Sequence, residues 1–249
     1  MIEHSSLLHE LSWSDINSLD TQKTVFLLPV GSTEQHGPQN PLGTDFLIAE
    51  YIARHSAASS PVAICLPTLP FGVSSHHRDF PGTLYLSPST FEAVVIEILL
   101  SLHIHDFRKV IVVNGHGGNT SAIFNALTTV NDKHGMIGLL YEWWKDPDLT
   151  QKYFGVPSAL HADAVETSVI WAAHPKLVVP ERFDDLSSSP EWGIKIGGLV
   201  KPSRTIEFTN SGIAGSIDNI SQEKGGALLD AAIKKLLEAI TALSDYKLP

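Results

Sequence analysis

The chain has 249 residues, of which 43% are hydrophobic and 18% charged, so it can build one large α/β domain and is too apolar to be disordered. Its formal net charge of −10 argues against nucleic-acid binding, because phosphates must be neutralised by cationic side chains. The single cysteine, Cys65, excludes an internal disulfide. No apolar stretch reaches the about 20 residues of a membrane span, and Met1 to Ser6 lacks a signal sequence. We therefore expect a cytoplasmic protein that binds no membrane.

Short apolar runs alternate with amphipathic segments along the chain. The runs predict buried strands at residues 24–30, 62–66, 109–114 and 136–141. The amphipathic segments predict helices at residues 45–54, 87–105, 120–134, 162–173 and 221–243. This alternation predicts the α/β class, with a mostly parallel sheet covered by helices on both faces and a single domain over 1–249. The segment from Pro180 to Gly215 breaks the rhythm, and a loop of this length is expected to serve function or a partner.

The first polar motif follows the first predicted strand. It reads Gly31-Ser-Thr-Glu34-Gln-His36-Gly-Pro38, and Asp45 comes nine residues after His36. In an open α/β sheet, ligands bind beyond the carboxyl ends of the strands. A mixture of carboxylates and imidazole is the ligand set expected for zinc, manganese or iron. The alternative is a helix-capping Asp45, a solvated Glu34 and an ordinary loop His36.

The second motif, Asn114-Gly-His116-Gly117-Gly118-Asn119, leaves the third strand and enters a helix. It matches neither a phosphate-binding P-loop nor a dinucleotide fingerprint. A histidine held between glycines at a strand end is better interpreted as a metal ligand or a base. The alternatives are an anion-cradling loop and a plain glycine-rich turn.

The third motif contains His161 and Glu166 at the start of a predicted helix. Both side chains can reach one cleft if His161 precedes the helix proper. Glu166 has apolar neighbours in sequence, and a buried carboxylate needs a partner. A metal would satisfy it, and an arginine in a structural ion pair would do so equally well.

Weaker signals come from the remaining histidines and tryptophans. His76 and His77 follow the second strand on the same sheet edge, and a surface loop is the favoured interpretation. Trp143 and Trp144 follow the fourth strand, where they could wall the cleft or pack in the core.

Taken together, these motifs resemble the creatininase (creatinine amidohydrolase) family from about Leu27 to Lys235. Besides the three motifs, the resemblance includes residues 79–83 (Asp-Phe-Pro-Gly-Thr) and a weaker piece at 212–215 with 223–225. It implies a single three-layer α/β/α domain and two divalent metal ions. Family members are typically hexameric and hydrolyse C–N bonds of small cyclic amides or formamides.

Carried over by motif, Glu34 and His116 would bind one metal and His36 the other. Asp45 would bridge both ions, and Glu166 is chosen to complete the second site. A hydroxide held by the metals would attack the amide carbonyl, because a metal lowers the pKa of its bound water from about 15.7 to about 7. His161 is the candidate that protonates the leaving nitrogen, and Glu166 is the second candidate if it is not a ligand.

Two departures from creatininase concern the substrate. Creatininase has Tyr-Glu directly after the histidine of the third strand, where this chain has Gly117-Gly118. It also has a Trp-Asp pair before the next motif, where this chain has Pro157-Ser158. The glycines are nearer to two other branches, a formamide hydrolase of flavin and deazaflavin biosynthesis and a peptidase that matures a redox-cofactor peptide.

These departures predict poor activity on creatinine and a larger amide or formamide as substrate, with a pyrimidine nucleotide as one option. The rival interpretations are a non-catalytic metal-binding member of the family and a dinucleotide-dependent oxidoreductase. The oxidoreductase is disfavoured because no Gly-x-Gly-x-x-Gly follows the first strand.

Overall fold

A computed structural model describes residues 5–247. Residues 1–4, which belong to the stretch searched for a signal sequence, and residues 248–249 lie outside this range. Within residues 5–247, no helix has both the length and the apolar character that a membrane crossing requires.

The main sheet has four parallel strands in the order β2-β1-β3-β4, as the alternating pattern predicts. Its strands are β1 (Val25–Val30), β2 (Ala63–Cys65), β3 (Lys109–Asn114) and β4 (Ile137–Glu142). A separate antiparallel hairpin consists of β5 (Ile194–Ile196) and β6 (Leu199–Lys201). The helices are α1 (Trp13–Asn17), α2 (Thr44–Ala58), α3 (Pro88–His103), α4 (Thr120–His134), α5 (Pro147–Phe154), α6 (Ala164–Ala173) and α7 (Gln222–Asp245).

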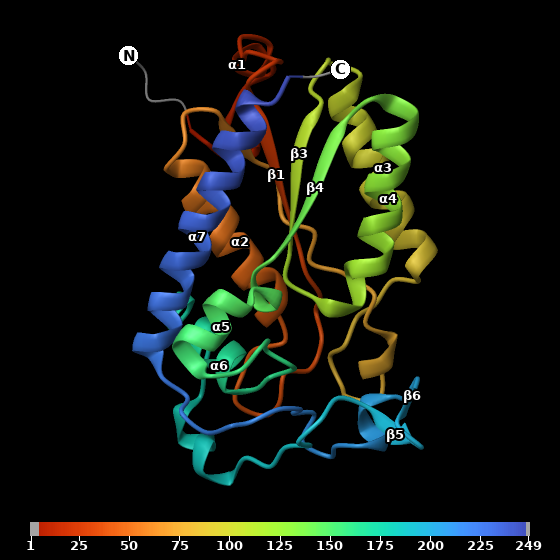
Figure 1. Cartoon of the computed structure of the whole chain (residues 1–249), viewed down its shortest axis with the longest axis vertical. Helices are drawn as coiled ribbons and strands as arrows, with labels where there is room; N and C mark the ends of the chain where they lie inside the picture. Colours follow the sequence, from red (N-terminus) through yellow and green to blue (C-terminus); the bar gives the residue numbers. More distant parts are fainter. Residues whose placement is uncertain (1–4, 248–249) are drawn as a thin grey trace.

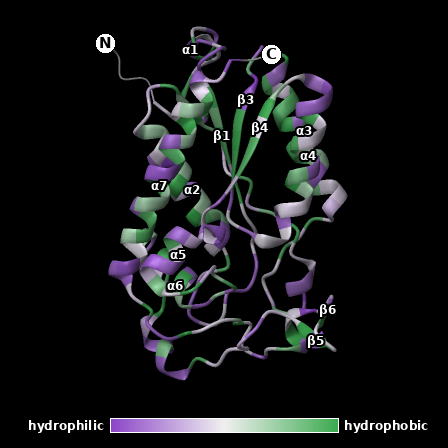
Figure 2. Ribbon diagram, viewed as in Figure 1, coloured by the Kyte–Doolittle hydropathy of each residue, from purple (hydrophilic) through white to green (hydrophobic). Residues whose placement is uncertain are grey.

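Helices cover both faces of the sheet (Figure 1). Alternate residues of a strand point to opposite faces, so the strands β1 and β3 supply two separate cores. Val25 and Leu27 pack with α2, α6 and α7, whereas Phe26 and Leu28 pack with α3 and α4. Both central strands are buried along their whole length, and the hydropathy colouring shows their middle parts as apolar (Figure 2). The fold is therefore the α/β sandwich that the sequence predicts.

The connections place a natural ligand site between β1 and β3. The chain leaves β1 through α2 to β2 on one side, and then crosses through α3 to β3 on the other side. Ligands in open α/β sheets bind beyond the carboxyl ends of the strands, at the point where the strand order reverses in this way. The first two sequence motifs follow β1 and β3 directly.

Several elements differ from the predicted boundaries. Helix α2 continues to Ala58 and α7 to Asp245, past the expected ends, and α1 and α5 were not expected. Helix α5 has a recognisable start, because Asp146 caps it and Pro147 occupies its first turn. The segment from Pro180 to Gly215 is less irregular than predicted, since it holds the hairpin β5–β6 and the 3₁₀ turns Pro180–Asp185 and Thr205–Glu207.

Candidate metal centre

The loop after β1 and the first turn of α2 carry three acidic or imidazole groups into one buried space. Glu34 and His36 are fully buried, and Asp45 is 2% exposed. Asp45 lies one residue inside α2, which begins at Thr44. The prediction that Asp45 opens this helix is confirmed. The positive end of a helix favours such a carboxylate.

Two glycines at the strand ends let α2 approach the sheet. A Cβ atom on Gly31 would lie 2.3 Å from the backbone nitrogen of Phe46, and one on Gly115 would lie 2.1 Å from the carbonyl oxygen of Asp45. Any larger residue would push the start of α2 away from β1 and β3. The glycine of the second motif that precedes His116 thus serves contact between backbones, not the cradling of an anion.

The end of β3 orients His116. The His116 backbone N–H donates to Asn114 Oδ1 at 3.1 Å, and the ring atom Nε2 lies 3.1 Å from the carbonyl oxygen of Val73. Donation from Nε2 to that carbonyl leaves Nδ1 free to act as an acceptor or ligand. Gly118 is required here, since a Cβ atom would lie 2.5 Å from the His116 ring and 2.2 Å from Val73 O.

His36 is oriented in the same manner. Its Nδ1 lies 3.2 Å from the carbonyl oxygen of Glu34, so Nε2 points at the carboxylates. Backbone carbonyls that hold the second ring nitrogen are the usual support of a metal-binding histidine.

The third motif reaches the same space, because His161 precedes α6. His161 pairs with Ala214 in an isolated antiparallel bridge, and Asp163 caps α6 by accepting from the N–H groups of Val165 and Glu166. Glu166 is 5% exposed and accepts a hydrogen bond from the Ala162 N–H. The alternative of an ion pair with arginine finds no support among residues 5–247, where the charged neighbour recorded for Glu166 is His36.

The structure brings all five predicted ligands together in two groups that share one carboxylate. Glu34, Asp45 and His116 form the first group, and His36, Asp45 and Glu166 form the second, with ligand atoms within 4.8 Å of one another in each. Asp45 Oδ1 lies 2.8 Å from His36 Nε2, while Asp45 Oδ2 lies 3.1 Å from His116 Nδ1. A third group of the same size joins Glu34, His36 and His161.

The buried carboxylates of this cluster are short of hydrogen-bond donors, as is expected of ligands for a metal cation. Both carboxylate oxygens of Glu34 and Asp45 Oδ2 are buried, and among residues 5–247 they have no hydrogen bond of good geometry. Imidazole nitrogens of His77 and His116 lie 3.1–3.3 Å from Glu34 Oε1 and Asp45 Oδ2. Buried carboxylates need a positively charged partner, which a coordinated metal ion supplies. Nitrogen and carboxylate ligands suit zinc, manganese and iron alike.

The electrostatics of the cluster also attract positive charge. Burial lowers the pKa of His36, but Asp45, Glu166 and Glu34 outweigh it and raise the value to about 10. The pKa of His116 is raised too, since Glu34 and Asp45 overcome the effect of its burial. Burial raises the pKa of Glu166 to about 8, with a like-charge contribution from Asp45. A proton or a metal cation among these carboxylates relieves the same repulsion.

One buried histidine of the cluster was not predicted. The expectation that His77 lies on a surface loop is wrong, because it is fully buried with Nε2 at 3.2 Å from Glu34 Oε1. Its Nδ1 lies 2.8 Å from Gln35 Nε2 and 3.0 Å from Thr205 Oγ1. Gln35 also contacts His161, whose Nε2 lies 2.8 Å from the amide nitrogen of Gln35. The adjacent pair His76-His77 on the correct sheet edge was the signal available in the sequence.

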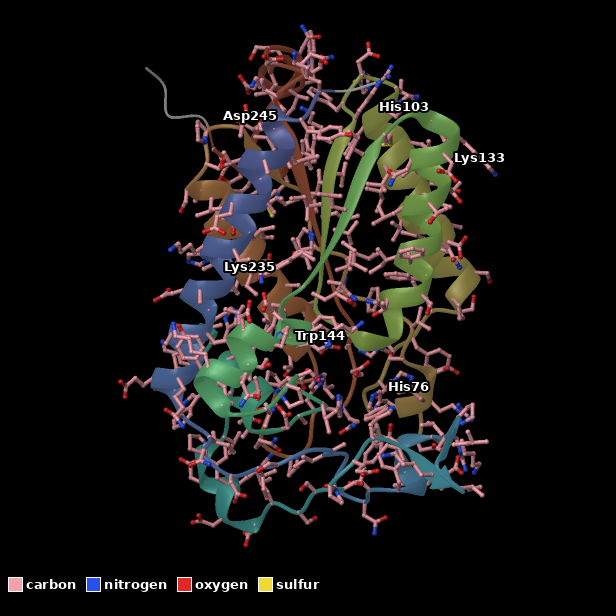
Figure 3. All side chains as sticks on the ribbon, in the orientation of Figure 1. His76, His103, Lys133, Trp144, Lys235 and Asp245 are labelled. Atoms are coloured by element: carbon pink, nitrogen blue, oxygen red, sulfur yellow. The ribbon has the colours of Figure 1, made fainter. Side chains whose placement is uncertain are left out.

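A cavity of about 450 Å³ opens above the cluster. Its floor includes Asp45, His116 and Glu166, and its wall includes Trp144 and Trp192. Trp144 lines the cleft and, at 6% exposed, also packs in the core, whereas Trp143 is 1% exposed and packs in the core alone. Figure 3 shows Trp144 and His76 toward the same end of the molecule, with His103 and Lys133 toward the opposite end. The volume lies within the range of about 300–1,000 Å³ that is common for small-molecule sites.

Comparison with known proteins identifies the family of this chain. Residues 9–240 match the creatininase model, described as creatinine amidohydrolase. The chain belongs to the creatininase family. A mycofactocin precursor peptide peptidase of Mycolicibacterium smegmatis is 31% identical over 72% of this chain and 70% of its own length. The creatinine amidohydrolase of Pseudomonas putida is 26% identical over 95% and 96% of the two chains.

Other relatives widen the range of substrates and show metal forms. A 3-dehydro-scyllo-inosose hydrolase of Thermotoga maritima is 29% identical over 90% of this chain and 76% of its own length. A mutant creatininase of Zn-Zn type has a TM-score of 0.80 at 25% identity, covering 98% of this chain and all of that chain. A manganese creatininase has a TM-score of 0.81 at 24% identity with the same coverage. This creatininase-family chain is therefore a hydrolase, and its residue groups are capable of binding metal.

Proposed function

We propose that the protein is a metal-dependent hydrolase that cleaves a C–N bond of a small cyclic amide or formamide with two divalent ions. Glu34 and His116 would hold one ion, and His36 and Glu166 the other. The observation that carries the proposal is Asp45, whose two carboxylate oxygens each face a different ligand group. A carboxylate placed in this way suits a bridging role between two ions.

When bound, the two ions would lower the pKa of a water molecule toward about 7 and polarise the amide carbonyl. The chain itself supplies proton transfer. His161 lies at the cavity surface, and burial together with positive charge at His36 lowers its pKa. A neutral His161 can accept a proton from the attacking water and return it to the leaving nitrogen. Glu166, with its raised pKa, is the second candidate for this step.

Metal content tests the site. We expect protein purified without chelator to contain one to two equivalents of zinc, manganese or iron per chain by elemental analysis. Chelation should lower the thermal midpoint and re-addition restore it, because a metal at 100 times its Kd stabilises a native state by about 2.7 kcal/mol. Absence of metal, combined with no change of the midpoint on metal addition, would contradict the proposal.

Creatinine is expected to be a poor substrate. The cavity is lined by Gly117 and Gly118, and within 4 Å of the Cβ position of Gly117 no atom of residues 5–247 is found. A small ring would leave polar groups of this open space unpaired, at about 1–3 kcal/mol each. We therefore expect kcat/KM for creatinine, followed as the ring-opened product creatine by chromatography, to be lower than for a formamidopyrimidine nucleotide, followed as released formate, with the same metals added to both. The opposite order would refute this inference.

A peptide amide is the second candidate substrate. It is favoured by the 31% identity to a precursor peptide peptidase and by a cavity that exceeds the needs of a small ring. A short peptide panel, followed as released amine with the same metals added, separates the two candidates. Release of amines from peptides only, in a metal-dependent manner, would select the peptidase. A metal-loaded chain that turns over neither class would instead favour the rival interpretation of a non-catalytic member.

We also propose a closed homo-oligomer, with a hexamer as the form expected by family resemblance. Exposed apolar side chains on the hairpin support self-association, since Ile196, Leu199 and Val200 are 66%, 77% and 61% exposed. Light scattering at micromolar concentration should give a mass of at least twice the 27.1 kDa of one chain. A monomeric mass would contradict the proposal.

A further inference from the structure

One side of the cavity is built by the segment that interrupts the predicted α/β pattern. The cavity lining takes six residues from the hairpin β5–β6 and its flanks, namely Trp192, Gly193, Val200, Lys201, Pro202 and Ser203. The hairpin lies at one end of the molecule (Figure 1), and His76 is drawn beside it (Figure 3). This segment therefore shapes the substrate space directly.

Trp192 is a cavity-lining residue of this segment whose ring lies against the buried histidines. The centroid of its ring lies 5.6 Å from that of His161 and 5.7 Å from that of His77. On another side, the Phe208 ring packs against it at 5.2 Å with an interplanar angle of 73°. Centroid separations of about 4.5–7 Å are typical of interacting aromatic rings. Trp192 is thus held in place as a half-buried indole at the cavity wall.

The positions of the polar and aromatic side chains in the cavity determine how a substrate can lie. Carboxylates and imidazoles occupy the floor, so the scissile amide must face Asp45, Glu166 and His161. The remaining part of the substrate then lies against the wall, which Trp192 shares with Trp144. A flat conjugated ring gains more from an indole than a saturated ring of similar size does, because the faces and edges of the two π-systems attract each other.

We infer that Trp192 selects amides that carry a flat, conjugated ring next to the scissile C–N bond. This inference deepens the proposed hydrolase function and rests on it. Trp192 is a specificity-determining residue in this scheme, and it takes no part in metal binding or proton transfer.

The test compares two substrates that share one scissile bond. Formanilide and N-cyclohexylformamide differ in whether the ring is flat and conjugated and also in the basicity of the leaving amine, so the effect of Trp192 is measured as the change in their kcat/KM ratio between wild type and variant. We expect the formanilide to N-cyclohexylformamide ratio of the zinc-loaded enzyme to fall by about 2–12-fold in Trp192→Ala and Trp192→Leu, mainly through KM for formanilide, which corresponds to the 0.5–1.5 kcal/mol of an aromatic pair. Trp192→Phe should show a smaller fall.

The matched control is Trp171→Phe, since Trp171 lies on α6 and packs on Phe183 at 5.3 Å. Its preference should equal that of the wild type. Metal content is measured for every variant, and an unchanged value in Trp192→Leu separates selection of substrate from damage to the site.

A binding experiment distinguishes failure of this inference from failure of the proposed function. Calorimetric titration of the zinc-loaded protein with benzamide and with cyclohexanecarboxamide reports ring preference without turnover. Preference for benzamide that disappears in Trp192→Leu supports the inference even if neither formamide is hydrolysed, in which case the proposed formamide activity fails. Equal preferences in wild type and Trp192→Leu, by rates or by calorimetry, overturn it.

Discussion

Asp45→Ala should remove both metal ions and abolish turnover, whereas His36→Ala should remove one ion. The Asp45 carboxylate belongs to both ligand groups, and His36 is not part of the group that contains His116. Changing residues that merely orient a metal ligand costs about 10–100-fold in affinity or activity, so losing the shared ligand should cost more than about 100-fold. Elemental analysis and a metal-supplemented rate assay on both variants measure the two effects.

The matched control for this pair is Glu50→Gln on the same helix. Glu50 pairs with Arg54 at 3.5 Å and is outside the three candidate metal groups formed by residues 5–247. It should keep the metal content and rate of the wild type. If Asp45→Ala and His36→Ala each retain one ion, Asp45 does not bridge, and the two groups must be filled independently.

The sequence predicted most of the ligand cluster because of a general property of parallel sheets. Glu34 and His36 follow β1 and His116 follows β3, and parallel neighbouring strands bring their carboxyl ends to one edge. The strands β1 and β3 could be predicted from short runs of apolar residues, because a strand that is buried on both faces has such a run. Glu166 could be assigned to the same cleft on the condition that His161 precedes the helix. The structure meets this condition, because His161 forms an extended bridge and α6 begins at Ala164.

Other features depend on contacts between distant residues and left no periodic signal. His77 contacts Gln35, from the loop after β1, and Thr205, from the 3₁₀ turn Thr205–Glu207. The hairpin β5–β6 has strands of three residues each, too short for an alternating pattern to be recognised. Trp192 lies next to the buried histidines only because that hairpin folds over the end of the sheet.

The roles of the glycines in the second motif also depend on contacts with distant residues, and substitutions can test them. From the sequence, they suggested a backbone left open for a ligand or an anion. The structure separates their roles. The Cβ position of Gly115 lies 2.1 Å from the carbonyl oxygen of Asp45, whereas that of Gly117 has no neighbour among residues 5–247 within 4 Å.

Gly115→Ala should therefore destabilise the protein and disturb its metal site, while Gly117→Ala should do neither. The added methyl group at position 115 meets backbone, which cannot swing aside, so β3 and the first turn of α2 must separate. Overpacking of this kind costs about 1–3 kcal/mol, and each kcal/mol lowers Tm by about 2–4 °C in a domain of this size, which predicts a fall of about 2–12 °C. The displaced helix start carries Asp45, so metal content should fall together with Tm. Calorimetry and elemental analysis of the two variants decide the matter, and equal Tm values for both would show that α2 does not depend on the close approach at Gly115.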